Sequence, residues 1–561
     1  MRRATSELDL QGLIAGAARL AGRAADEAHF AAACVRAGMV GLEPPQRIAQ
    51  MALAFQRHGM LAALVTVGAV RNGERVAIRD ERGDVTYREL DEHTNALANE
   101  WRARGLQAGD GVAILVRNHR GFLEAVFAAA KCGTRIVLLN TSFAGPQIRD
   151  VAAREGTDLL VYDDEFSELV GQVEPRLGRW RAWSEVDVDM DARDGADPTL
   201  ASLIEIGSAG AVPKPASPPR IVILTSGTTG TPKGAPRPEP KSLGLVGGLL
   251  GMVPFRARET TELTVPLFHA FGLTSMAMGL ALGSTLVLRR RFDPAQALDG
   301  LRDNRATAMV VVPVMLARIL ELGEEEIRAR GLSQLRVIFV SGSALGSDLS
   351  RRAMSAFGPV VYDMYGSTEV AYATIATPTD MREEPGSVGT VVRGAVVKIL
   401  DEHGREVPTG TTGRIFVGNS AQFEGYTGGE TKEQIDGLMS SGDVGHFSPR
   451  GRLFVDGRDD EMIVSGGENV FPAEVEELLA SHEAVREAAV IGVTDEQFGQ
   501  RLKAFVALNG GSTLSEDDVK DHVRQNLARY KVPREVVFLD ELPRNATGKV
   551  LKRALTASGD D

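Results

Sequence analysis

A loop of ten residues, from Thr225 to Gly234, has the composition of a polyphosphate site. It reads Thr-Ser-Gly-Thr-Thr-Gly-Thr-Pro-Lys-Gly and follows an apolar run, residues 221–224, that predicts a buried strand. Its glycines let backbone N–H groups approach an anion, its hydroxyls add donors, and Lys233 adds a point charge. The spacing is not that of a Walker loop, Pro232 argues against a helix directly afterwards, and a flexible linker is the alternative interpretation. The candidate residues are Thr225, Ser226, Gly227, Thr228, Thr229, Gly230 and Lys233.

A second polar group follows the strand that we predict at residues 360–364. Ligands of open parallel sheets lie beyond the carboxyl ends of the strands. An aromatic ring, a hydroxyl and a carboxylate suit a nucleotide there: Tyr365 for the adenine face, Thr368 for the α-phosphate and Glu369 for Mg²⁺. Asp363 would accept a hydrogen bond from the adenine amino group, and Gly366 completes the set. The alternative is a surface turn with a solvated glutamate.

Two further loops carry a carboxylate and a lysine that a nucleotide site would use. Asp443, in Ser-Gly-Asp-Val-Gly at 441–445, can accept both ribose hydroxyls, which are costly to bury unpaired. Lys549, in Pro-Arg-Asn-Ala-Thr-Gly-Lys at 543–549, can stabilise the charge that develops when a carboxylate attacks the α-phosphorus. Taken alone, the first is simply a turn and the second an exposed lysine near the end of the chain.

In form and in order, these motifs resemble those of the AMP-forming adenylating enzymes: acyl-CoA synthetases, luciferases and peptide-synthetase adenylation domains. The resemblance covers roughly residues 70–555 and is closest to bacterial fatty-acid–CoA ligases. It implies that Arg458 meets the ribose and that Asp460 is a hinge between a large and a small domain, although Asp459 and Glu461 are also acidic. It implies four catalytic residues, Lys549, Glu369, Thr225 and Lys233. It also implies a stretch facing the pantetheine arm of coenzyme A, made of Ser465, Gly466, Gly467 and Glu468.

The acid is expected beside the α-phosphate. A lone histidine among apolar residues, as in Pro-Leu-Phe-His-Ala-Phe-Gly at 266–272, is usually part of a core. The resemblance implies instead that His269 and Phe271 flank the carboxylate and the acyl tunnel. Two segments expected to line this pocket, 341–345 and 370–374, are small and apolar, which favours a medium or long aliphatic chain over acetate. The candidate pocket residues from the first segment are Gly342, Ser343 and Ala344.

The order of the predicted elements indicates an α/β fold. We expect a large N-terminal domain of two parallel-sheet α/β lobes plus a small β-barrel-like subdomain, followed by a small mobile α+β C-terminal domain. A strand at 111–116, a helix at 122–131 and a strand at 135–139 predict a βαβ unit. Further strands are predicted at 284–288, 307–312, 335–340, 360–364, 395–400 and 413–418, and a helix at 472–479. The predicted domains are a helical N-terminal extension at 1–65, the large domain at 66–459 and the small domain at 460–561, and a polar stretch at 207–219 is interpreted as a linker between two α/β runs.

Composition restricts the classes of partner. The 561 residues carry a net charge of −12, which repels nucleic acid and anionic lipid. Two cysteines, Cys34 and Cys132, cannot form a disulfide framework, so a cytoplasmic location is expected. We find no segment of the ~20 apolar residues that span a bilayer. The N-terminal stretch either packs on its own domain or makes a peripheral membrane or partner contact, and a homodimer is left open. Its apolar stripe consists of Leu10, Leu13, Ile14, Ala17, Leu20 and Ala21.

We therefore predict a fatty-acid–CoA ligase that uses ATP, Mg²⁺ and coenzyme A. A medium- or long-chain carboxylate would react with MgATP to give acyl-AMP, and coenzyme A would then take the acyl group after the small domain rotates. The alternatives are an acyl-AMP ligase that loads a carrier protein, an aryl-acid–CoA ligase and a non-catalytic nucleotide-binding scaffold. Two residues depart from the family pattern: Arg414, often Glu, which could alter surface pairing near the domain interface, and Glu461, frequently Asp.

Overall fold

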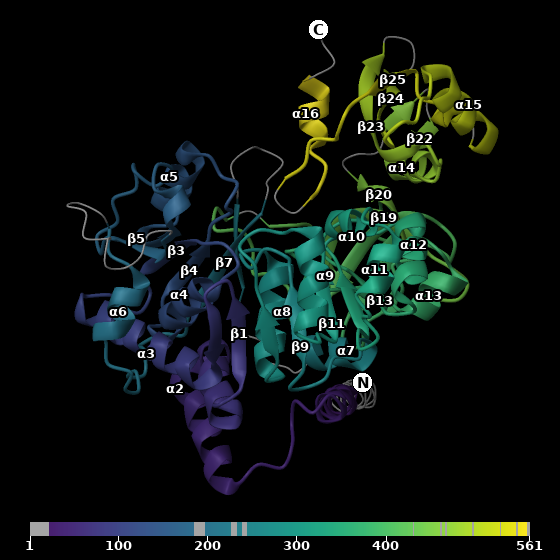
Figure 1. Cartoon of the computed structure of the whole chain (residues 1–561). Helices are drawn as coiled ribbons and strands as arrows, with labels where there is room; N and C mark the ends of the chain where they lie inside the picture. The colour runs from purple at the N-terminus through teal and green to yellow at the C-terminus, as the bar shows by residue number, and fades with distance from the viewer. Residues whose placement is uncertain are drawn as a thin grey trace, which may run out of the picture.

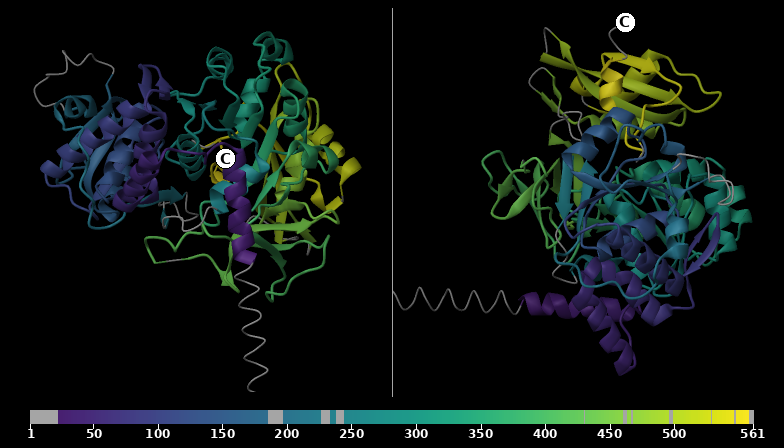
Figure 2. Two further views of the ribbon diagram at one scale, coloured as in Figure 1. Left: turned by 90° about the horizontal axis from the view of Figure 1, so that it is seen from below. Right: turned by 90° about the vertical axis from the view of Figure 1, so that its left-hand side faces the viewer.

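The structure, a computed structural model, describes residues 22–184, 197–225, 233–237, 244–429, 431–459, 463–465, 468–495, 499–527, 529–545 and 548–557. Figure 1 shows two α/β lobes side by side, with a smaller domain above them that carries the C-terminus. Seen from below, the lobes remain distinct (Figure 2). The predicted fold class is confirmed.

The first lobe contains the predicted βαβ unit. Its strands β3 (Gly111–Leu115) and β4 (Arg135–Leu138) pair in parallel, joined by α4 (Arg120–Lys131). These strands are apolar throughout because both faces are covered: Ile114 packs with α4 and Leu115 with α5. The other elements are α3 (Tyr87–Ala103), α5 (Gly145–Arg154), β5 (Thr157–Asp163), β6 (Arg179–Trp183), α6 (Leu200–Ile206), β7 (Arg220–Thr225) and β8 (Lys233–Arg237). The sheet order is β6-β5-β3-β4-β7-β8.

The second lobe is built on a nine-stranded sheet whose central strands are parallel. Its strands are β1 (Val76–Asp80), β2 (Gly83–Thr86), β9 (Thr260–Leu263), β10 (Thr285–Val287), β11 (Ala308–Val311), β12 (Val337–Val340), β13 (Val361–Tyr365), β14 (Thr374–Ala376) and β15 (Thr390–Val391). Its helices are α7 (Gly244–Met252), α8 (Ala270–Ala281), α9 (Pro294–Asp303), α10 (Pro313–Leu320), α11 (Glu324–Ala329), α12 (Ser347–Phe357) and α13 (Pro378–Glu383). Val310 and Phe339 pack with α8 on one face, and Val311 and Val340 with α9, α10 and α12 on the other. The order is β15-β14-β13-β12-β11-β9-β10-β1-β2.

The polar stretch at 207–219 is irregular, but it does not separate the two lobes. Strand β7, which follows it, pairs with β4 of the first lobe. Strand β1, which lies far before it, pairs with β10 of the second lobe. Our interpretation of this stretch as the division between two α/β runs is therefore wrong. Sheet partners far apart in sequence set the lobe boundary, and local polarity does not report them.

The predicted β subdomain and small domain follow in order. The subdomain sheet contains β16 (Val396–Leu400), β17 (Gly413–Gly418), β18 (Gln434–Ile435), β19 (Leu438–Phe447) and β20 (Leu453–Arg458). The small domain contains β21 (Ile463–Ser465), β22 (Glu468–Val470), α14 (Pro472–Ala480), β23 (Val485–Asp495), β24 (Gly499–Leu508), α15 (Glu516–Asn526), β25 (Glu535–Phe538) and α16 (Lys552–Ala557). Helix α15 begins at a capping box in which Ser515 and Asp518 satisfy each other's backbone N–H groups.

The N-terminal extension is helical where it is described. A helix covers residues 22–36, and α2 (Pro45–Asn72) crosses the boundary that we place at residue 65. Within α2, Gly59 has φ 76° and ψ −175°, so the helix is broken there. α2 is long and apolar enough to cross a membrane, but Ala62, Ala63 and Val65 after the break are buried in the protein. The predicted stripe from Leu10 to Ala21 lies outside the described residues.

Glu262 on β9 is a buried carboxyl that no motif indicates. One of its oxygens accepts a hydrogen bond from Arg289 at 3.3 Å, and the other is buried with no partner among the described residues. Burial raises its pKa from 4.5 to about 8, because Arg289 only partly offsets the loss of water. Between pH 4.5 and about 8, Glu262 is therefore mainly protonated in the folded protein and mainly ionised in the unfolded chain.

We predict that the stability of the Glu262→Gln variant relative to wild type increases as the pH rises. Between pH 4.5 and about 8 the native state binds more protons at this site than the unfolded state, so wild-type stability falls as the pH increases and levels off above that range. Glutamine has no such titration. Thermal unfolding of both proteins from about pH 5 to about pH 9 checks this. An excess in melting temperature that is constant with pH would contradict the assignment.

Candidate active site

The predicted phosphate loop connects two paired strands. The apolar run before it forms β7 and the residues after it form β8, and Thr225 lies opposite Lys233 across the antiparallel pair. No helix follows the loop directly, in agreement with the prediction from Pro232, and the strand that does follow was not predicted. Ser226, Gly227, Thr228, Thr229 and Gly230 lie outside the described residues.

Lys233 and Glu369 both contact Tyr426, a residue that was not predicted from the sequence to belong to the site. The Lys233 Nζ is 5.5 Å from the centre of the Tyr426 ring, and the Tyr426 hydroxyl donates to Glu369 Oε1 at 2.7 Å. Ser367 Oγ donates to the other Glu369 oxygen at 2.9 Å. A lysine for phosphate and a carboxylate for a cation are thus brought together by a loop of the β subdomain. The available signal was an aromatic residue between glycines, Gly425-Tyr426-Thr427-Gly428.

A magnesium ion fits beside Glu369. Among the described residues, no group of three or more His, Cys, Asp or Glu is placed to hold a metal. Mg²⁺ nevertheless often binds through one or two carboxylates and the phosphates of its nucleotide. Each Glu369 oxygen accepts one described hydrogen bond, which leaves lone pairs for such a cation.

Tyr365, Asp443 and Arg458 form one hydrogen-bonded group. The Tyr365 hydroxyl donates to Asp443 Oδ2 at 2.6 Å, and Arg458 donates to Asp443 Oδ1 at 3.1 Å. Burial and the Asp443 charge hold the pKa of Tyr365 well above its ordinary value, so the phenol remains a donor. From the sequence, only the ring of Tyr365 was predicted to have a role. Asp443 keeps lone pairs for ribose hydroxyls.

Asp363 and the Tyr365 turn complete the nucleotide side. Asp363 is buried on β13, and burial raises its pKa from 3.8 to about 7. Gly366 is required by space, since a Cβ there would lie 2.2 Å from the Ala371 carbonyl oxygen. Thr368 and Glu369 follow in this turn and are both partly exposed.

The Lys549 loop of the small domain rests on the large domain. Asn545 N donates to the Lys549 carbonyl at 2.9 Å, and Asn545 Oδ1 accepts from Lys549 N at 2.9 Å, which closes a tight turn. Gly548, with φ 78°, comes so close to α10 that a Cβ on it would be 2.1 Å from Val314 Cγ1. The Lys549 side chain is exposed at this junction. The turn therefore holds the lysine at the domain boundary.

The residues predicted for the acyl pocket differ in burial: His269 and Phe271 are partly buried, and residues 342–344 are exposed. Phe271 packs on Phe339 with ring centres 5.3 Å apart. His269 contacts Phe268 at 4.4 Å between ring centres, and its Nε2 is buried with no partner among the described residues. Burial lowers the pKa of His269 to about 4, so the imidazole is neutral near pH 7.

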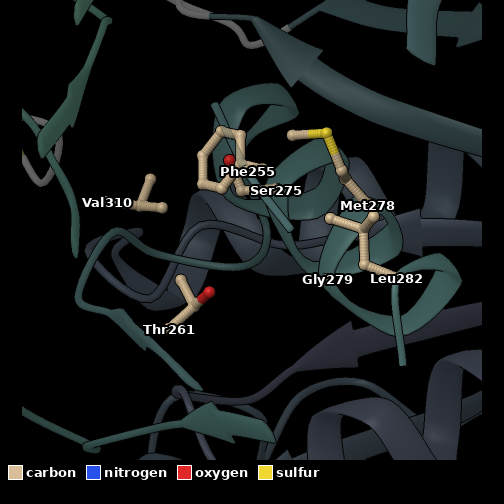
Figure 3. A pocket seen from close by; sticks show the side chains of 7 residues that line it. All are labelled: Phe255, Thr261, Ser275, Met278, Gly279, Leu282 and Val310. Carbon is tan, nitrogen blue, oxygen red and sulfur yellow. The ribbon is translucent and has the colours of Figure 1, made fainter. Parts of the chain in front are cut away.

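Gly342, Ser343 and Ala344 are exposed rather than enclosed in a pocket. They follow β12 at its carboxyl end, where Val312 lies 3.3 Å from the position of a Gly342 Cβ and 3.9 Å from that of Gly548. This segment is thus beneath the Lys549 loop. A cavity near Phe255, between α8 and the sheet, has only about 10 Å³, room for about one water molecule (Figure 3). This cavity is too small to hold an acyl chain.

The hinge and coenzyme A side are described in part. Asp460, Gly466 and Gly467 lie outside the described residues. Ser465 and Glu468 pair across β21 and β22. Next to the predicted hinge, Arg414 donates to Asp459 at 3.0 Å and also pairs with Glu433, so this departure from the family pattern does place an ion pair at the domain boundary.

Comparison with known families decides the class of enzyme. Residues 65–427 match the AMP-binding enzyme family, and residues 474–549 match the AMP-binding enzyme C-terminal domain. The chain belongs to the AMP-binding enzyme family. The predicted class, an AMP-forming acid–thiol ligase, is confirmed at this level, and ATP is the nucleotide that such an enzyme uses.

Relatives of this AMP-binding enzyme differ in the acid they use. Indoleacetate–CoA ligase of Aromatoleum aromaticum is 33% identical over 490 residues, 85% of this chain and 94% of that protein. Fatty acid–[acyl-carrier-protein] ligase ScoC of Streptomyces coeruleorubidus is 30% identical over 501 residues, 85% of this chain and 92% of that protein. The o-succinylbenzoate CoA synthetase of Bacillus subtilis, in complex with its acyl-adenylate, has a TM-score of 0.74 at 27% identity and covers 88% of this chain and 97% of its own.

Proposed function

We propose that this AMP-binding enzyme is an acid–CoA ligase for an aromatic or arylaliphatic carboxylate. The observation that carries the proposal is the surroundings of His269: a neutral imidazole beside the ring of Phe268, whose buried Nε2 has no partner among the described residues. Two residues later in the chain, Phe271 packs on Phe339. Aromatic rings pack well on aromatic walls, and the imidazole offers one polar contact to the carboxylate or a ring substituent. The relatives that act on indoleacetate and o-succinylbenzoate support it.

In the first half-reaction, a carboxylate oxygen attacks the α-phosphorus of ATP and pyrophosphate leaves. We assign Lys233 and the hydroxyls of its loop to the phosphates, Tyr365 and Asp443 to the nucleoside, and Lys549 to the charge at the reacting centre. Mg²⁺ would neutralise phosphate charge beside Glu369. In the second half-reaction, the thiol sulfur of coenzyme A attacks the acyl carbonyl, AMP leaves with the electron pair, and the thiol proton passes to solvent.

A fatty acid is the second candidate, and the open segment Gly342–Ala344 favours it. An aliphatic chain could extend past these small exposed residues, whereas an aryl acid would stop at the rings. The relative that joins a fatty acid to an acyl-carrier protein supports both a fatty substrate and an acceptor other than coenzyme A.

An AMP-release assay with coenzyme A discriminates these candidates. The acids are acetate, octanoate, palmitate, benzoate, indoleacetate and o-succinylbenzoate. We expect AMP release that requires coenzyme A and is fastest with an aryl acid. A maximum at octanoate or palmitate would replace our proposal by the fatty-acid ligase. Pyrophosphate release without any acyl-CoA product would instead identify an acceptor other than coenzyme A.

We predict that His269→Phe raises the KM for the acid roughly tenfold, since an unpaired buried polar group costs ~1–3 kcal/mol. The phenyl ring keeps the packing against Phe268 and removes only the polar contact. The KM for ATP is the internal control and should not change. Equal changes in both constants would show that the substitution disturbs the fold around β9 and α8 instead.

A further inference from the structure

Exposed apolar side chains are concentrated in one short part of the chain. Among the described residues, twelve large hydrophobic side chains are exposed, and seven of them lie between residues 35 and 60. These are Val35, Val40, Leu42, Ile48, Leu53, Phe55 and Met60. A concentration of this kind on a globular protein marks an interaction surface.

The first part of α2, before the break at Gly59, turns its apolar side outward. Ile48, Ala52 and Phe55 are spaced i, i+4, i+7 and lie on one helix face, with Ala49 and Leu53 beside them. All five are exposed, and we call them the outer apolar face. The opposite side is inward: Ala54 is 5% exposed and His58 is 6% exposed. In a helix that only completes a core, this orientation would be reversed.

The break at Gly59 explains why the described part of the protein does not cover this segment. After the break, α2 enters the core and packs on α3, α4 and α8. Before it, about 14 helical residues, roughly 21 Å at 1.5 Å per residue, project from the lower end of the molecule (Figure 1). The right panel of Figure 2 shows this projection as well.

The charge around the outer apolar face is opposite to that of the whole chain. Residues 35–60 contain Arg36, Arg47 and Arg57 against one acid, a net charge of +2 in a chain of −12. That acid, Glu43, is already held by Arg71 at 3.0 Å and Arg47 at 3.4 Å. The helical segment from residue 45 to 58 has no acidic residue.

We propose that the outer apolar face docks this protein onto an anionic lipid bilayer. An exposed apolar helix segment that also carries arginines and glutamines has the composition of an interfacial helix. The local positive charge suits anionic head groups, although the whole chain has a net charge of −12. The small domain lies at the other end of the molecule, so a docked large domain leaves its hinge unobstructed (Figure 1).

Vesicle flotation of the full chain tests this proposal. The probes are vesicles of phosphatidylcholine alone and of phosphatidylcholine with one quarter phosphatidylglycerol. We expect flotation with the anionic vesicles, weaker flotation at high salt, and a loss of roughly tenfold or more in Ile48→Ser/Phe55→Ser, because both apolar side chains would leave water on docking. The matched control, Ile206→Ser, removes an equally large exposed side chain elsewhere and should float as wild type does.

The same proteins are then sized by light scattering without vesicles. A wild-type dimer that Ile48→Ser/Phe55→Ser converts to a monomer, with no flotation on either vesicle, would assign the face to a second copy of the chain and overturn the proposal. Flotation that is equal for wild type and this double variant would also overturn it. Unchanged ATP–pyrophosphate exchange in the variants shows that they remain folded, because no active-site residue is altered.

Discussion

Replacing Lys549 by alanine is expected to reduce adenylate formation by roughly 10²–10³-fold, as the loss of a positioned donor at a developing charge usually does. The attack of a carboxylate on the α-phosphorus brings anions together, and a lysine ammonium offsets their repulsion. The described structure places the lysine turn on α10, above the carboxyl ends of β11 and β12. Those strand ends are where a parallel sheet binds its ligand.

The second half-reaction should tolerate the same substitution. The thiol attacks the acyl carbon and no anion approaches the α-phosphorus in this step, so Lys549→Ala should make thioester from supplied acyl-AMP at a rate close to that of wild type. Isotope exchange between pyrophosphate and ATP measures the first step, and acyl-CoA formation from acyl-AMP measures the second. Lys520→Ala, a small-domain lysine paired with Glu516, is the control and should retain both activities. A parallel loss of both in Lys549→Ala would refute the assigned role.

Sequence reasoning succeeded where local pattern determines structure. The strands beginning at Gly111 and Val337 are buried on both faces, so each is a continuous apolar run with a recognisable end. The apolar run before the phosphate loop was predicted as a strand for the same reason and forms β7, whereas β8 after the loop was not predicted. Arg414 pairs with Glu433 and Asp459, and its effect on pairing near the domain boundary relative to glutamate stays a prediction.

It failed where contacts are made between distant segments. Nothing near Tyr426 indicates that its hydroxyl reaches Glu369, 57 positions earlier in the chain. The hydrogen bond from Tyr365 to Asp443 joins a strand of the second lobe to the β subdomain, and no local pattern reports it. The outward orientation of the apolar face of α2 was also not predicted, because periodicity shows that a helix has an apolar side but not which way that side points.

The second large loss of adenylate formation is expected from a change in the turn that carries Lys549. Gly548→Ala should lower adenylate formation roughly 10²-fold, because the added Cβ forces the turn away from α10, and a displacement of about 1 Å can have that effect. A Cβ at this position would be 2.1 Å from Val314 Cγ1, and the φ of 78° adds strain for any residue with a side chain. Pyrophosphate exchange again provides the measurement.

Two comparisons separate the steric effect from the backbone strain. Gly511 in the same domain has φ 82° with nothing within 4 Å of its Cβ position, so Gly511→Ala introduces the same strain without a contact and should leave exchange near wild type. Val314→Ala combined with Gly548→Ala removes the clashing methyl group and should restore roughly tenfold of the lost rate, while the strain of ~1–2 kcal/mol remains. If the double variant is no better than Gly548→Ala, then contact with α10 does not position Lys549, and the turn acts through its own geometry alone.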